Sequence, residues 1–269
     1  MTTSSSQVTV HMIVKNEDQW VWYALQSVLP YADQILVTDT GSSDRTVELI
    51  KSLASPKIQF SQVKVGSAAD MTAARSQQLN ATKTDWLWIV DGDEIYTDTG
   101  DKEVQSAITH GYKGIVVRRY DLLGDVYHRQ VETVGEYNLL GIRGHLVTRL
   151  IRRSAFPGLR LDRPYPLEAY VDSEGKVIHS YDQKSWYVTK GHLYHAMYLK
   201  RSSLGGNLPM LNRGKYRIES GVRITGETPS VFALPRPSFL PDPLAHRSRE
   251  YELAASIITP VKNFKRKYL

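Results

Sequence analysis

A short apolar run that ends in acidic residues, WLWIVDGDE at positions 86–94, constrains the fold of this chain most. Its five consecutive apolar residues indicate a strand that is buried on both faces. Asp91, Asp93 and Glu94 follow directly, and carboxylates clustered at the end of a buried strand repel one another and cost desolvation energy. A divalent cation would remove this cost, because hard oxygen ligands suit Mg²⁺ or Mn²⁺, and Gly92 would leave room for a ligand beside the backbone. The run predicts a metal site, with a plain acidic turn as the alternative.

Apolar strands alternate with amphipathic helices through the first ninety residues. Strands are predicted at 8–14, 34–38, 58–65 and 86–90, and helices at 19–29, 45–53 and 68–81. Asp18 and Asp44 stand where they could cap the first two helices. This alternation predicts an α/β fold with a doubly wound, mostly parallel sheet and helices on both faces.

Polar side chains follow three of these strands. They are Asn16 and Glu17 after the first, Asp39 after the second, and Asp91 and Asp93 after the fourth. Right-handed crossovers place the carboxyl ends of parallel strands at one edge of the sheet, where open sheets bind ligands at a switch point in strand order. We therefore expect these side chains to converge on one crevice.

The second part of the chain gives weaker signals. We predict helices at 102–110 and 185–199 and strands at 114–120 and 144–152, the last with outward basic residues. His192 and His195 would share a face of the later helix, and we interpret them as packing residues, with a ligand face as the alternative. Five prolines between Pro229 and Pro243 predict an extended segment without a core of its own.

Composition limits the classes of protein that this chain can represent. It has no cysteine, which excludes disulfides and thiolate metal sites and favours a reducing compartment. The first ten residues lack the features of a secretory signal, and no run approaches the roughly eighteen apolar residues of a membrane span. We therefore expect a cytoplasmic protein that is soluble or peripheral on the inner face of the membrane.

Charge is distributed unevenly. Residues 1–100 carry seven basic and twelve acidic side chains, and residues 101–269 carry twenty-seven basic and sixteen acidic ones. One interpretation is an acidic part that holds a metal and a basic part that faces an anionic partner; the other is simple solvation of the surface. Four basic residues at 262–267 could contact anionic lipid, whereas no recognition motif accompanies the charge to suggest nucleic-acid binding.

Taken together, the motifs resemble the nucleotide-binding half of a family-2 glycosyltransferase with the GT-A fold. The matching pieces are VKNE at 14–17, DTGSSDRT at 39–46, AAR at 73–75 and VDGDE at 90–94. RLIRR at 149–153 and the segment after it are similar to the acceptor region of bacterial cell-surface glycosyltransferases, of the kind that build surface polysaccharide or lipopolysaccharide. There the segment often ends in Val-His-Glu, whereas Leu167-Glu168 stands in that place here without the histidine.

The resemblance implies roles for individual residues. Val14, Asn16, Glu17 and Gly92 would belong to the nucleotide-sugar site. Asp39 would accept hydrogen bonds from the base of the nucleotide, and Arg75 would face the nucleotide or its diphosphate, with a surface salt bridge as the alternative. Asp91 would contact the ribose and the metal, and Asp93 would hold Mn²⁺ or Mg²⁺ against the diphosphate. His179 could be a metal or diphosphate ligand, and Glu94 could support the metal ligands or be a helix-start charge.

The implied reaction transfers a sugar from a nucleoside diphosphate, with UDP favoured, to a hydroxyl of a glycan or glycolipid. The family inverts the anomeric centre in one displacement, so a single carboxylate base is required. Glu168 is our candidate, because it lies in a less polar segment than the other acidic residues between the RLIRR strand and His179. Asp172 is the alternative.

Other functions are compatible with parts of this pattern. A haloacid-dehalogenase phosphatase carries its Asp-x-Asp on the first strand, and a sugar-nucleotide pyrophosphorylase has a glycine-rich start where this chain has VKNEDQW. A non-catalytic nucleotide-sugar-binding protein is the alternative from another class. Within the glycosyltransferase interpretation, we expect a nucleotide-sugar-binding half at 1–100, an acceptor-binding half at 101–204 and a proline-rich, basic extension at 205–269.

Overall fold

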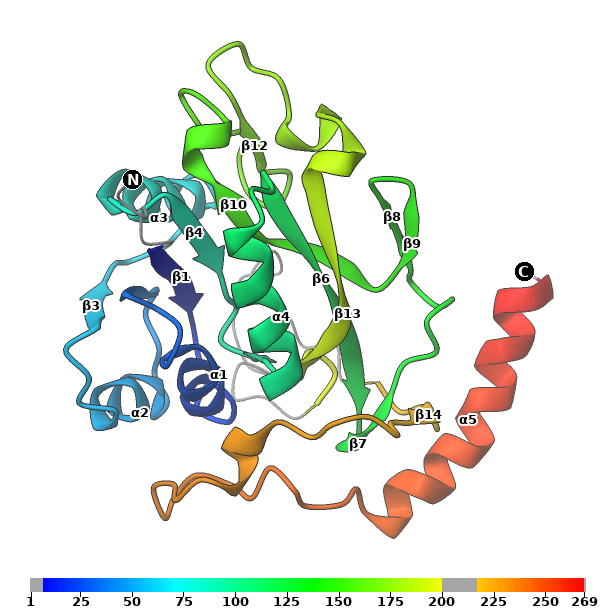
Figure 1. The fold of residues 1–269 in the computed structure, drawn as a ribbon. Helices are drawn as coiled ribbons and strands as arrows, with labels where there is room; N and C mark the ends of the chain where they lie inside the picture. Colours follow the sequence, from blue (N-terminus) through cyan, green and yellow to red (C-terminus); the bar gives the residue numbers. More distant parts are fainter. Residues whose placement is uncertain (1–6, 200–216, 269) are drawn as a thin grey trace.

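The computed structural model describes residues 7–199 and 217–268 (Figure 1). The helices are α1 (Val21–Val28), α2 (Thr46–Ser52), α3 (Ala68–Ala81), α4 (Asp98–Thr109) and α5 (Arg249–Tyr268). The strands are β1 (Val8–Val14), β2 (Gln34–Asp39), β3 (Ile58–Gln62), β4 (Trp86–Ile89), β5 (Glu94–Ile95), β6 (Gly114–Leu123), β7 (Asp125–Arg129), β8 (Tyr137–Leu139), β9 (Ile142–Gly144), β10 (Leu146–Arg152), β11 (Arg160–Asp162), β12 (Ala169–Val171), β13 (Trp186–His195) and β14 (Val222–Arg223).

A ten-stranded sheet organises the molecule, in the order β14-β7-β6-β10-β4-β1-β2-β3, with β13 paired to β6 and β5. Strands β3, β2, β1 and β4 are parallel to one another, as the alternation of strands and helices predicts. Strand β10 runs antiparallel between β4 and β6, and β13 runs parallel to β6. The predicted α/β class with a doubly wound, mostly parallel sheet is confirmed, and one sheet joins the first hundred residues to those that follow.

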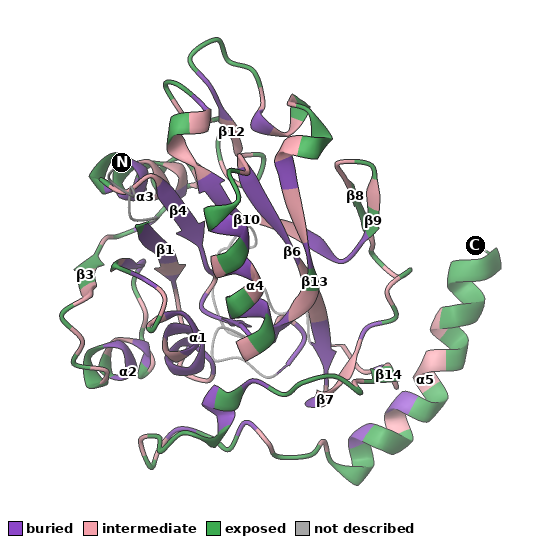
Figure 2. Ribbon diagram, in the orientation of Figure 1, coloured by how far each residue is buried: buried purple, intermediate pink, exposed green. Residues whose placement is uncertain are grey.

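Helices cover both faces of this sheet, because neighbouring residues of its central strands point to opposite sides. Trp86 and Trp88 of β4 face one core with α1, α2 and α4, whereas Leu87 and Ile89 face a second core with Leu79 of α3. Figure 2 shows the buried residues concentrated along β1 and β4 and over nearly all of α1. The four predicted strands and three predicted helices of the first ninety residues are all present; β1 and α3 have the predicted ends, and the other five elements are shifted by one to three residues at one or both ends.

Helix capping differs from the prediction at the first helix. The carboxylate of Asp44 accepts a hydrogen bond from the backbone N–H of Thr46 at 2.9 Å, at the start of α2. Helix α1 begins later than expected, after Trp20, and has no side-chain cap at its beginning. Asp18 is therefore not its cap.

The prediction of a helix at 185–199 is wrong, because residues 186–195 form strand β13. This strand lies in the sheet beside β6 over most of its length, and its end pairs with β5. Backbone pairing with strands distant in the sequence overrides a local pattern that a helix could also satisfy.

The proline-rich segment covers the main core and is not a loose extension. Its Val231 and Phe232 are buried, and the Phe232 ring packs edge-on against Tyr23 of α1 with ring centroids 5.4 Å apart. The boundary expected between 204 and 205 lies outside the described residues. Within 7–199 and 217–268, none of the helices has the length and apolar character needed to cross a bilayer.

Candidate active site

The switch point of the sheet lies between β1 and β4, which are parallel neighbours. From β1 the chain proceeds to β2 and β3 on one side and then crosses to β4 on the other. A Cβ added to Gly92 would meet Val14 Cγ1 at 2.9 Å and Glu17 Cγ at 3.3 Å. Glycine therefore permits a close approach of the acidic loop to the end of β1, and that side of Gly92 is filled by the chain itself.

The loop after β1 is joined to the loop after β2. Asn16, with a positive φ of 50°, donates its backbone N–H to Ser42 Oγ at 2.8 Å, and its side-chain Oδ1 accepts from the backbone N–H of Ser43 at 2.8 Å. The backbone N–H of Glu17 donates to Thr46 Oγ1 at 2.7 Å. The two predicted nucleotide-site loops thus form one hydrogen-bonded unit at the carboxyl edge of the sheet.

Asp39 is fully buried at the end of β2. Its carboxylate accepts hydrogen bonds from the backbone N–H groups of Gly41 and Ser42, from the Ser42 hydroxyl, and from Gln62 Nε2 at 3.2 Å. Asp39 therefore fixes the shape of the loop that follows it.

Arg149 of β10 reaches the acidic loop from the antiparallel neighbour of β4. Its Nη2 donates to Asp91 Oδ2 at 2.7 Å and also to Glu94 Oε1. Arg149 and Glu94 are both buried, so the expectation of outward basic residues on this strand is wrong at Arg149. Glu94 lies in β5 and not at a helix start. The guanidinium of Arg149 thus compensates two of the three carboxylates, whereas the sequence predicts that a divalent metal cation compensates all three.

His195, at the end of β13, lies between Asp93 and Asp121. Its Nε2 is 3.3 Å from Asp93 Oδ2, and its Nδ1 is 2.9 Å from Asp121 Oδ1. Strand pairing explains this position, because residue 195 lies opposite Glu94 of β5 and Asp121 of β6. The sequence analysis interpreted His195 as a packing residue, and the structure instead joins it to the acidic loop. His192 does pack, with its ring stacked on Tyr120 at 4.1 Å between centroids.

Asp121 has three basic neighbours. Besides His195, Arg119 Nε lies 3.0 Å and His145 Nδ1 lies 3.7 Å from its carboxylate oxygens. Burial alone would raise the pKa of Asp121, but the hydrogen bond with His195 and the charges of His195, Arg119 and His145 outweigh it and lower this pKa. Asp121 therefore stays ionised and can hold the Nδ1–H of His195, which leaves Nε2 directed at Asp93.

Glu168 and Arg75, predicted for separate tasks, form an ion pair. Arg75 Nε lies 3.3 Å from Glu168 Oε2, and Thr72 Oγ1 donates to Glu168 Oε1 at 2.9 Å. Both charged side chains are largely buried, so this is not the exposed surface pair of the alternative interpretation. Glu168 is thereby held against α3 by two partners.

Asp172 and His179 lie in other surroundings. The carboxylate of Asp172 accepts from the backbone N–H groups of Glu174 and Lys176, both at 2.9 Å, and from the Tyr181 hydroxyl at 2.5 Å. The hydrogen bond from Tyr181 lowers the pKa of Asp172. His179 Nε2 lies 2.6 Å from Thr148 Oγ1, and burial lowers its pKa. These contacts give Asp172 a turn-forming role and make His179 a packed, neutral side chain.

Asp93 and His195 could hold a divalent cation. Within the described ranges, no group of three or more His, Asp, Glu or Cys side chains has the geometry of a complete metal site. The carboxylate oxygen of Asp93 nevertheless suits Mn²⁺ or Mg²⁺, and of the two cations only Mn²⁺ also suits the imidazole nitrogen that faces it; either one commonly completes its coordination with substrate phosphates and water. The residues present fit such a cation.

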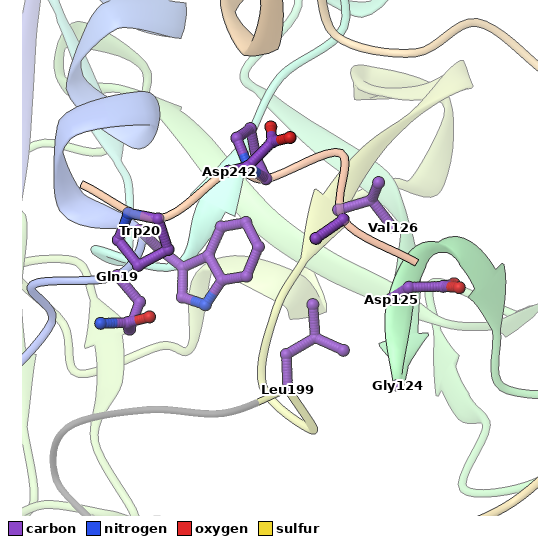
Figure 3. A pocket seen from close by; sticks show the side chains of 10 residues that line it. Gln19, Trp20, Gly124, Asp125, Val126, Leu199 and Asp242 are labelled. Atoms are coloured by element: carbon purple, nitrogen blue, oxygen red, sulfur yellow. The ribbon is translucent and has the colours of Figure 1, made fainter. Parts of the chain in front are cut away.

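A cavity of about 130 Å³ lies among the start of α1, strand β7 and the proline-rich segment (Figure 3). Figure 3 shows Trp20, Val126 and Leu199 around it, from three different segments, with Asp125 and Asp242 also on its wall. The backbone N–H of Leu199 donates to the carbonyl of residue 196, whose own N–H donates to the carbonyl of residue 93, each at 2.9 Å. The cavity is therefore one turn away from the acidic loop.

Comparison with known proteins identifies the family. Residues 9–160, more than half of the chain, match the family described as glycosyl transferase family 2. The chain belongs to this family. The family-2 match covers the crevice built by β1, β2 and β4 and continues through β10, so it includes the acidic loop and Arg149.

Curated relatives share only part of their length with this chain. It is 37% identical over 89 residues to a TPR repeat-containing protein of Synechococcus elongatus, which is 33% of this chain and 21% of that protein. It is 29% identical over 90 residues to the prophage-derived glycosyltransferase SunS of Bacillus subtilis, covering 34% of this chain and 21% of SunS. The chain thus spans about a fifth of the length of these relatives.

Two solved structures show a weak likeness in shape. S. aureus TarS in complex with UDP-GlcNAc has a TM-score of 0.47 and 14% identity over 70% of this chain and 58% of that chain. Glucosyl-3-phosphoglycerate synthase of Mycobacterium tuberculosis, in complex with Mn²⁺, UDP and its product, has a TM-score of 0.46 and 16% identity over 71% of this chain and 72% of that chain.

Proposed function

We propose that this family-2 glycosyltransferase moves a sugar from a nucleoside diphosphate donor, with UDP favoured, to a hydroxyl acceptor, with inversion and with a divalent cation. The observation that supports this most directly is the position of His195 opposite Asp93, at the carboxyl end of β4 and beside the switch point of the sheet. Groups from three strands meet there, at the position where open α/β sheets bind nucleotides.

Asp93 and His195 would hold the cation. When bound, it would supply positive charge that stabilises the leaving diphosphate. Asp121 keeps the His195 ring in place, and Arg149 holds Asp91 and Glu94 so that the loop keeps its shape. Asp91 would contact the ribose while remaining bound to Arg149, and its contact with the metal stays a prediction.

The nucleotide would lie over the joined loops after β1 and β2. Asp39, Asn16 and Glu17 define the shape of these loops, and Val14 closes the floor beneath Gly92. The carboxylate of Asp39 already accepts hydrogen bonds from Gly41, Ser42 and Gln62, and a carboxylate accepts about four in all. A hydrogen bond from the uracil ring would therefore have to replace one of these or share its acceptor oxygen.

Glu168 remains the proposed catalytic base, with Asp172 as the alternative. Glu168 pairs with Arg75 and is held by Thr72, and an acceptor hydroxyl that displaces Arg75 could donate its proton to the freed oxygen. Asp172 accepts three hydrogen bonds inside a turn, which leaves it less available for proton transfer. His179 is not retained as a metal ligand in this proposal, since its ring nitrogen bonds Thr148.

The acceptor is proposed to be a glycan or glycolipid of the cell surface, with residues 101–204 forming the acceptor-binding half and residues 1–100 the donor-binding half. Leu199 on the wall of the cavity of Figure 3 is linked to the acidic loop through residue 196, and the exposed carboxylate of Asp242 can bind sugar hydroxyls. We further propose that the protein makes peripheral contact with an anionic membrane.

A donor panel tests the proposal. Purified protein is incubated with each common nucleotide sugar, with Mn²⁺, Mg²⁺ or chelator, and free nucleotide is measured together with UDP affinity by calorimetry. We expect metal-dependent hydrolysis of a UDP-sugar that is lost in His195→Gln and retained in the matched variant His192→Gln on the same strand. UDP affinity that is equal with metal and with chelator would contradict the role of the cation, and donor binding without turnover would indicate a non-catalytic nucleotide-sugar-binding protein.

A further inference from the structure

Helix α5 is fixed to the body of the protein along one side. Tyr251 and Ala255 are buried on that side, and the Tyr251 hydroxyl lies 2.9 Å from the carbonyl oxygen of Arg217. Further along, Arg266 and Lys262 both reach the buried carboxylate of Glu219, with Arg266 Nη2 at 2.8 Å and Lys262 Nζ at 3.2 Å. These contacts determine which side of the helix faces outward.

The outward side carries a row of large apolar side chains, which we call the α5 stripe. Its members are Leu253, Ile257, Val261, Phe264 and Tyr268, each between 59% and 66% exposed. Their spacing of four, four, three and four residues places them within an arc of about 80° on the helix. Figure 2 shows most of α5 exposed, with its few buried residues at the end nearest the sheet. Exposed apolar residues in one row indicate a contact surface more strongly than scattered ones do.

Basic side chains flank the α5 stripe. Lys265 and Lys267 lie on opposite edges of it by helical periodicity and are exposed. The acidic residues Glu250 and Glu252 occupy the first turn, at the other end of the helix. Of the four basic residues expected to form a tail, Lys262 and Arg266 are engaged by Glu219, so the outward charge comes from these two lysines.

We propose that the α5 stripe is a docking surface for an anionic lipid bilayer. An apolar row between lysines matches the boundary between acyl chains and anionic head groups, where the lysine stems can extend toward the phosphates. A second copy of the chain packed in parallel is the less favourable occupant, because two parallel helices would bring the lysines at the edges of their stripes together. An antiparallel second copy would place these lysines near Glu250 and Glu252, and the test below separates that outcome from lipid binding. The helix would lie along the membrane with its basic end held most firmly. This surface is separate from the proposed sugar-transfer site and does not depend on it.

Vesicle sedimentation tests the surface on the full chain. The vesicles are phosphatidylcholine alone or with about one third phosphatidylglycerol, at low and high salt. Ile257→Asp/Phe264→Asp places two charges in the stripe, and Ser256→Asp/Asn263→Asp places the same two charges at exposed positions outside it, on the side of Lys267. We expect the parent and the control variant to pellet with anionic vesicles and the stripe variant to remain in solution. Lys265→Ala and Lys267→Ala should each weaken the partition about fivefold.

Two readouts complete the test. Because the substituted side chains are more than half exposed, the thermal midpoint of the stripe variant should match that of the parent. Identical pelleting of the parent and the stripe variant, or no pelleting of the parent, would overturn the proposal. So would a parent dimer in sedimentation velocity that the stripe variant loses in the absence of lipid, since that outcome assigns the stripe to a second copy.

Discussion

Arg149 Nη2 lies 2.7 Å from Asp91 Oδ2, and this contact joins β10 to the acidic loop that follows β4. The same guanidinium reaches Glu94, so one cation from the second part of the chain compensates two carboxylates from the first. Burial alone would lower the pKa of Arg149, but the charges of Glu94 and Asp91 outweigh it and raise this pKa, so the arginine is charged at any working pH. The loop can therefore keep its shape with or without a divalent cation.

Replacing Arg149 should therefore cost stability as well as activity. Arg149→Met removes the cationic partner of the buried Glu94 and one partner of the partly buried Asp91, which we expect to lower the free energy of unfolding by roughly 3–5 kcal/mol. Arg152→Met is the matched control, because Arg152 lies on the same strand and pairs with the partly exposed Asp85, where a loss of about 1 kcal/mol or less is typical. Urea unfolding measures both. Equal losses of unfolding free energy in the two variants would show that the Arg149 ion pairs stabilise the fold no more than an exposed pair does. Partial recovery in Arg149→Met/Glu94→Gln would show that the uncompensated charge of Glu94 causes the loss.

His11 should make stability depend on pH. Burial, with smaller contributions from the charges of Arg153 and Arg75, lowers its pKa from 6.5 to about 3. Between these two values the imidazole of His11 binds a proton in the unfolded chain but not in the folded protein. The contribution of neutral His11 to the free energy of unfolding is therefore complete above about pH 6.5 and is lost as the pH falls toward 3. Within this window the free energy of unfolding should fall by about 1.4 kcal/mol per pH unit on account of this histidine.

The difference between the parent and His11→Gln isolates this slope from that of the carboxylates. Stability is measured by denaturant unfolding from pH 7 to about pH 4, and the matched control is His110→Gln, at an exposed histidine. The control should retain the slope of the parent, and His11→Gln should flatten it. Parallel curves for the parent and His11→Gln would contradict the prediction.

Much of the first ninety residues could be predicted because their pattern is local. Each strand there is a short apolar run, each crossover helix follows within a few residues, and parallel order fixes which ends meet. Asp39, Asp91 and Asp93 were found in this way. Their partners were not, because Arg149 and His195 come from strands whose neighbours lie far away in the sequence.

The misassigned strand β13 did carry a signal. Trp186, Tyr187, Val188 and Thr189 are aromatic or β-branched, which favours a strand, and Gly191 interrupts any helix. The aromatic and histidine residues further along also fit one face of a helix, and this spacing is the pattern that predicts a helix at 185–199. The burial of Arg149 is likewise not predicted by its local sequence. An arginine in a strand is usually exposed, and only the position of β10 beside the acidic loop explains why this one is buried.

Asp39 should influence nucleotide binding by one of two routes that can be separated. If its carboxylate contacts the uracil ring, Asp39→Asn should weaken UDP binding by about 1.5–3 kcal/mol, the usual value for a charged hydrogen bond. Ser42→Ala keeps the carboxylate but removes the hydroxyl that bonds it, so it should cost much less. Equal losses in the two variants would show that Asp39 acts only by shaping the loop. Tighter binding of GDP than of UDP to the parent would contradict the uracil assignment.

Glu168→Gln is the decisive substitution for the catalytic base. Glutamine keeps the shape of the side chain and can still bond Thr72, but it cannot take a proton from the acceptor hydroxyl. Transfer should fall by roughly 10²–10⁴-fold, the usual contribution of a positioned base, while donor and metal affinity measured by calorimetry stay near those of the parent. Arg75→Met separates proton transfer from the ion pair, because it leaves the Glu168 carboxylate in place without its cationic partner.

The alternative base is tested in the same assay. Asp172→Asn keeps an oxygen that can accept from the backbone N–H groups of its turn, so the fold should tolerate it with a modest loss of stability. We expect this variant to transfer sugar at a rate near that of the parent, because the carboxylate of Asp172 is occupied by the Tyr181 hydroxyl and the turn. Normal transfer by Glu168→Gln together with a dead Asp172→Asn would reverse the assignment, and the base would then lie four residues further along the chain.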